Sequence, residues 1–80
     1  MSAKTAEGTV IDTRGLRCPL PVLRVRKLMR GVAAGTEVPV LATDPGAEQD
    51  FRDYCEASGC TFVSAEYLEG GVLRALIRKN

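Results

Sequence analysis

The stretch "CPLPVLRVRKLMRG", residues 18–31, predicts an α-helix that begins directly after a cysteine. Its apolar residues recur at spacings of three and four, which is typical of a helix with one buried face. That face is expected to hold Val22, Val25, Leu28, Met29 and Val32. Both prolines fall in the first turn, where backbone N–H groups have no helical partner, so they stiffen the start without breaking the helix. We therefore expect a helix over residues 19–30, with Cys18 as its N-cap.

A second helix is predicted over residues 44–59. Asp44 suits the N-cap and Pro45 the first helical position, and Gly59 is expected to end the helix. The inward face is expected to hold Ala47, Phe51, Tyr54, Cys55 and Ser58.

Four β-prone segments surround these helices, at residues 9–12, 36–44, 60–68 and 72–79. Gly70-Gly71 lies between the last two segments and supplies the positive φ angles of a tight hairpin. Pro39 cannot donate to a strand ladder, so it predicts a bulge, or a strand that begins after it.

The predicted order of elements is β-α-β-α-β-β. Right-handed crossovers place both helices on the same face of one sheet, and the final hairpin makes that sheet mixed. We expect an α/β (α+β) two-layer sandwich with a four-stranded sheet. Residues 9–80 are expected to form one domain, preceded by a flexible N-terminal tail over residues 1–8.

The composition of the 80 residues excludes several classes of site. The net charge of +1 gives no global attraction to nucleic acids or membranes, and the apolar runs are too short to cross a bilayer. Three cysteines without a secretory signal favour a reducing, cytoplasmic location. Histidine is absent, which excludes a Cys-His pair and imidazole ligands for zinc. We expect no metal and no cofactor.

Cys18 is the candidate reactive group. As an N-cap it would lie at the positive end of the helix dipole, beside Arg17 and close to Arg14. The N–H of Leu20 would remain free to donate to the sulfur, because Pro19 and Pro21 carry none. These features predict a lowered thiol pKa and a nucleophilic thiolate. A packing role is the alternative, since cysteine is among the most buried residue types.

The other two thiols receive different interpretations. Cys55 lies on the inward face of the second helix, which favours packing. Cys60 follows the end of that helix. A Cys55–Cys60 disulfide, or a resolving role for Cys60, is conceivable but disfavoured in the cytoplasm.

The segment "DTRGLRCPLPVLRVRK", residues 12–27, resembles the TusA/SirA-like sulfur-carrier family. The residues that match its Cys-Pro-x-Pro motif and the upstream positions are Asp12, Gly15, Cys18, Pro19 and Pro21. The resemblance continues through Lys27, "ATDPGA" and the closing "LIRK". Pro39 and Cys60 depart from the family pattern, outside the motif.

The resemblance implies a βαβαββ sandwich and a persulfide relay without turnover of its own. Cys18 would accept sulfane sulfur from a cysteine desulfurase or a rhodanese-type donor and pass it to an acceptor protein. The pathways it implies are tRNA thiolation, molybdenum-cofactor enzymes and sulfur oxidation. Arg17, Pro19 and Pro21 would shape the surroundings of the thiol.

The basic face of the first helix is the predicted docking surface, through Arg24, Lys27 and Arg30. We expect a monomer when the protein is free, with no membrane and no direct nucleic-acid partner. A regulatory or nucleic-acid-binding module on the same scaffold is the alternative, and it would act independently of Cys18. A thiol redox or haem role has little support.

Overall fold

The computed structural model describes residues 10–80, and it contains two helices and a four-stranded sheet. The elements in chain order are β1 (Ile11–Thr13), α1 (Leu20–Met29), β2 (Glu37–Ala42), α2 (Ala47–Ser58), β3 (Thr61–Leu68) and β4 (Val72–Arg78). A single 3-10 turn, Glu69–Gly71, joins β3 to β4. The tail and Thr9 of the first predicted strand lie outside the described residues.

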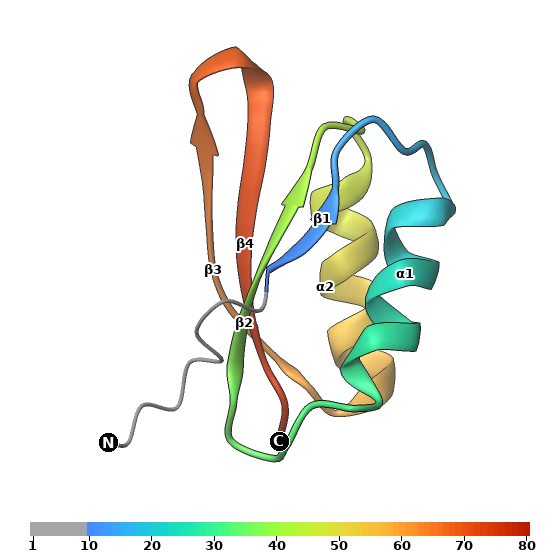
Figure 1. The fold of residues 1–80 in the computed structure, drawn as a ribbon, viewed down its shortest axis with the longest axis vertical. Coiled ribbons are helices and arrows are strands. Elements are labelled where there is room, and N and C mark those ends of the chain that lie inside the picture. Colours follow the sequence, from blue (N-terminus) through green and yellow to red (C-terminus); the bar gives the residue numbers. More distant parts are fainter. Residues whose placement is uncertain (1–9) are drawn as a thin grey trace.

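The sheet has the strand order β1-β2-β4-β3. β1 runs parallel to β2, whereas β4 is antiparallel to both of its neighbours, β2 and β3. Both helices cover the same face of this mixed sheet (Figure 1). The predicted fold class and order of elements are therefore confirmed.

The core fills the space between the helices and the sheet. Val25 and Met29 of α1 meet Phe51 and Cys55 of α2 above the inward residues of β2 and β4. The buried strand residues are Ile11, Val38, Val40, Ala42, Leu73, Ala75 and Ile77. On α1 the buried side chains are Pro21, Val25 and Met29, one turn apart.

Two predicted inward residues, Leu28 and Ser58, are exposed instead. Leu28 is 44% exposed, because the buried stripe of α1 is narrow and Leu28 lies about 100° away from Met29 around the helix. Ser58 is also exposed, in the last turn of α2, and Tyr54 is half-buried beside the core.

Both helices begin later than predicted. Pro19 is the N-cap of α1, so Cys18 lies one residue before the cap. Gly46 is the N-cap of α2. The carboxylate of Asp44 accepts the N–H of Gly46 at 3.0 Å, and its carbonyl accepts the N–H of Ala47 at 3.0 Å. These bonds make a turn before the helix, so Asp44 does not cap it.

Pro39 produces neither a bulge nor a late start of its strand. β2 begins at Glu37 and pairs with β4 without interruption through Pro39. β1 pairs only with residues 40–42, so among the described residues no strand lies beside Pro39 on that edge. A residue without an N–H is tolerated at such a place. The irregularity of the sheet lies in β3, between Phe62 and Ser64.

Lys79 binds backbone carbonyls at the C-terminal end of α1. Its Nζ donates to the carbonyl of Met29 at 2.7 Å and to that of Val32 at 3.1 Å. A helix leaves its last carbonyls without partners, and a lysine is well suited to bind them. The hairpin between β3 and β4 follows the prediction, with positive φ angles of 81° and 75° at Gly70 and Gly71.

Candidate functional site

Cys18 lies in the loop between β1 and α1, and its side chain is exposed. Gly15 gives this loop its turn, since its φ of 82° falls in the left-handed region that favours glycine. The N–H of Gly15 donates to Oγ1 of Thr43 at 2.9 Å, and the N–H of Leu16 donates to the carbonyl of Thr13 at 3.2 Å. The loop that presents the thiol is therefore tied to the residue that follows β2.

The backbone around Cys18 differs from the prediction. The Cys18–Pro19 peptide bond is cis, and the N–H of Leu20 donates to the carbonyl of Arg17 at 2.8 Å. That N–H is therefore not a donor to the sulfur. Pro21 does lie in the first turn of α1, where it is buried against the core.

Acidic neighbours, rather than basic ones, set the electrostatics of the thiol. Hydrogen bonding to the Asp50 carboxylate raises the pKa of Cys18, and burial and the charges of Asp50 and Asp44 raise it further. Neither Arg14 nor Arg17 is among the groups that shift this pKa. The predicted lowering of the Cys18 pKa is therefore wrong, because α2 brings Asp50, and the turn before α2 brings Asp44, close to the thiol.

Arg14 is engaged away from the thiol. Its guanidinium grips the Asp12 carboxylate with two bonds, each 2.9 Å long. Those bonds, with the Arg14 N–H at 3.0 Å, hold the pKa of Asp12 down at about 2. Arg14 therefore stabilises the start of the loop and contributes no free charge to Cys18.

A small cleft lies beside the loop. It has a volume of about 260 Å³, and Arg17 lines it together with Leu16, Thr43 and Asp44. Arg17 is exposed and forms no ion pair within residues 10–80. The structure thus places this arginine next to the site, but on a rim that it shares with Asp44.

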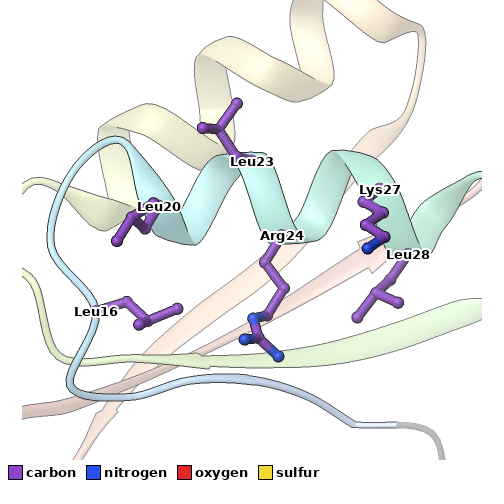
Figure 2. Close-up of a pocket in the computed structure, with 6 residues that line it drawn as sticks. All are labelled: Leu16, Leu20, Leu23, Arg24, Lys27 and Leu28. Atoms are coloured by element: carbon purple, nitrogen blue, oxygen red, sulfur yellow. The ribbon is translucent and has the colours of Figure 1, made fainter.

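A larger groove of about 380 Å³ runs along α1. Figure 2 shows Leu16 facing Leu20 at one end, Lys27 and Leu28 at the other, and Arg24 between them. Leu20, Leu23 and Leu28 are between 44% and 50% exposed. Two of the predicted docking residues, Arg24 and Lys27, thus border one apolar groove.

Arg30, the third predicted docking residue, lies elsewhere. It lines a separate cavity at the far end of α1, with Cys60 and Lys79. The structure therefore does not bring Arg30 together with Arg24 and Lys27.

Each of the three cysteines is a free thiol. Cys55 is 3% exposed in the core, as its pattern predicted, and burial raises its pKa to about 11. Within residues 10–80 no cluster of cysteine, aspartate and glutamate side chains is arranged to hold a metal ion. None of the helices there is long and apolar enough to cross a bilayer.

Sequence reasoning missed Asp44 and Asp50 as neighbours of the thiol, and the leucines of the groove as its lining. A signal for the acids was present. β1 and β2 are parallel, so the loops that follow them meet at one edge of the sheet. That relation alone places the segment after β2 beside Cys18.

Comparison with known proteins matches this arrangement to one family. A family model described as "Sulfurtransferase TusA" matches residues 9–79. The "Sulfur carrier protein TusA" of Allochromatium vinosum is 37% identical over 70 residues, which cover 88% of this chain and 91% of that protein. The crystal structure of a SirA-like protein from Desulfitobacterium hafniense has a TM-score of 0.76 and 29% identity, and the match covers 88% of this chain and 95% of that one.

Proposed function

Because this chain belongs to the TusA family of sulfur carrier proteins, we propose that it carries sulfane sulfur as a persulfide on Cys18. The observation that carries this proposal is the contrast among the thiols. Cys18 is exposed on an anchored loop, whereas Cys55 is buried and Cys60 is half-buried. A thiol that must reach two partner proteins in turn has to be accessible to both.

The transfer needs no net oxidation. The Cys18 thiolate attacks the outer sulfur of a donor persulfide, the donor S–S bond breaks, and the donor leaves as a thiolate. The product is Cys18–S–SH. An acceptor thiolate then attacks the same outer sulfur, and Cys18 leaves as a thiolate. The protein is a relay that ends each cycle unchanged, not an independent enzyme.

Asp50 and Asp44 give this relay a resting state. Since both acids raise the pKa of Cys18, they favour the protonated thiol over the thiolate in the free protein. A donor with basic side chains around its persulfide would offset these two charges on docking. The thiolate is the reactive form, so docking would favour the nucleophile only where sulfur is available.

The groove along α1 is the proposed contact surface for donor and acceptor. Its exposed leucines suit an apolar side chain of a partner, and Arg24 and Lys27 suit an acidic rim. By family resemblance the donor is a cysteine desulfurase or a rhodanese-type protein. The relay would operate in the cytoplasm and supply tRNA thiolation, molybdenum-cofactor enzymes or sulfur oxidation.

Intact-protein mass spectrometry tests the proposal. The reduced protein is incubated with a cysteine desulfurase and cysteine, and in parallel with a rhodanese and thiosulfate. We expect a gain of one sulfur atom that reductant reverses, mapped to Cys18. Cys18→Ser should abolish the adduct, and Cys60→Ser, the matched control, should retain it.

Two results would overturn the proposal. One is an adduct that persists in Cys18→Ser. The other is the absence of any adduct with both donors while the wild-type protein is shown to be folded by circular dichroism.

A further inference from the structure

The cavity that Arg30 lines lies at the other end of α1 from Cys18. It has a volume of about 310 Å³, within the range of small-molecule sites. Its polar lining consists of Arg26, Arg30, Tyr54, Ser58, Cys60 and Lys79. Since α1 has 10 residues and is about 15 Å long, this cavity is separate from the Cys18 loop.

The charge of this cavity is positive. Arg26, Arg30 and Lys79 line it, and none of the acidic side chains in residues 10–80 does. Neither arginine forms an ion pair within the described chain. The C-terminal ends of α1 and α2 each contribute about half a negative charge, which offsets about one of the three cations. The balance attracts an anion.

A thiol lies inside this positive cavity. Cys60 is free and half-buried, and it precedes β3 directly. Tyr54 lines the same cavity, and burial followed by the charge of Cys60 raises the pKa of its hydroxyl. The tyrosine therefore stays protonated and can donate to the sulfur or to a ligand.

We propose that this cavity binds a small anionic disulfide and that Cys60 exchanges with it to form a mixed disulfide. The Cys60 thiolate attacks one sulfur of R–S–S–R, a Cys60–S–S–R bond forms, and the original S–S bond breaks. The second half leaves as RS⁻ and takes up a proton from water. Cys60 is oxidised and the leaving sulfur is reduced, so the disulfide is itself the oxidant.

The three thiols should respond differently to the charge of a disulfide. Cys18 lies beside Asp50 and Asp44, which repel an anionic reagent. Cys55 is buried and has a pKa of about 11, so it reacts slowly with any disulfide. Only Cys60 combines access with positive surroundings, so only Cys60 should prefer the anionic reagent.

The test compares three disulfides on the full chain in the Cys18→Ser background and in the wild type. Oxidised glutathione is the anionic probe, hydroxyethyl disulfide the neutral one and cystamine the cationic one. Peptide mapping gives the initial rate of modification at each cysteine. At Cys60 we expect oxidised glutathione to react about tenfold faster than cystamine after each rate is normalised to a small cysteine peptide.

Charge variants locate the effect in the cavity. Arg26→Gln with Arg30→Gln should remove most of the anionic preference at Cys60 and leave the rate with hydroxyethyl disulfide unchanged. Arg24→Gln with Lys27→Gln removes the same charge from the other face of α1, and it should leave the preference at Cys60 intact. All four side chains are exposed, so both variants are expected to fold.

The proposal is overturned if Cys60 shows no preference among the three reagents, or if both double variants reduce the preference equally. These results do not depend on whether Cys18 carries sulfur, so the proposal for Cys60 and the proposal for Cys18 can fail separately.

Discussion

The two ends of helix α1 hold accessible thiols in opposite electrostatic surroundings. Before the first turn, Cys18 is exposed and faces the carboxylates of Asp50 and Asp44. Near the last turn of α1, Cys60, which directly precedes β3, is half-buried in the cavity lined by Arg26, Arg30 and Lys79. The helix dipole alone would give the reverse pattern, with the anion-stabilising environment at the N-terminus. The full charges of side chains, from α1 itself at the Cys60 end and from α2 and the turn before it at the Cys18 end, outweigh the partial charges of the helix.

The largest expected difference between the two ends of α1 is in how strongly each affects docking of the sulfur donor. Arg24→Glu with Lys27→Glu reverses the charge of the groove beside Cys18. The rate of sulfur transfer from the donor should fall by about tenfold or more, because electrostatic steering and contact are both lost. Single-turnover transfer followed by mass spectrometry gives the rate.

The matched change at the other face is Arg26→Glu with Arg30→Glu. It alters the net charge equally, so it should cause a clearly smaller loss of transfer. An equal loss would show that transfer responds to net charge, and that the groove in Figure 2 is not the docking surface.

A smaller effect is expected at the thiol itself. Asp50→Asn removes the acceptor and the charge that raise the pKa of Cys18, so that pKa should fall. The fraction of thiolate at neutral pH then rises, and alkylation of Cys18 by iodoacetamide should become several-fold faster. The pH profile of alkylation, mapped by peptide, should move to lower pH.

Asp53→Asn is the control for this experiment. Asp53 lies on the same helix, where it accepts a hydrogen bond from the side-chain amide of Gln49 at 2.9 Å. It is not among the groups that shift the pKa of Cys18. A pH profile that moves equally in both variants would contradict the role given to Asp50.

The smallest expected change concerns stability at the Cys60 end. Lys79→Met leaves the carbonyls of Met29 and Val32 without their donor, and it should lower the free energy of unfolding by about 1–2 kcal/mol. Urea unfolding measures this difference. Lys27→Met, on the exposed face of α1, should change it far less. Equal losses would mean that the bonds from Lys79 add no net stability.

Local patterns predicted most of the fold. The apolar spacing of both helices, the Gly70-Gly71 turn and the order of elements depend on neighbours within a few residues, and the structure confirms them. The prediction that Leu28 is buried is wrong, because the spacing of apolar residues does not reveal how wide the buried stripe of the helix is. Pro39 was misjudged because the length of β1, not of β2, decides whether its missing N–H matters.

The exposure of Cys18 was predictable from its place before the first helix, but its electrostatic surroundings were not. Arg14 and Arg17 are close to Cys18 in sequence, yet Arg14 is held by Asp12. Asp50 is distant in sequence, yet it has the largest effect on the pKa of Cys18. Charges act through space, so a ranking by sequence distance fails wherever two parallel strands bring separate loops together.

The position of β4 has a consequence for how the chain folds. β4 lies between β2 and β3, and it is the last strand of the sheet along the chain. During synthesis, which proceeds from the N-terminus, both helical segments are therefore complete before β4 is made. β4 is the strand that joins the β1–β2 pair to β3. Contacts of long sequence separation must close late, which predicts a slow, cooperative transition rather than stepwise growth from one end. Segments ending before residue 72 should lack a stable sheet.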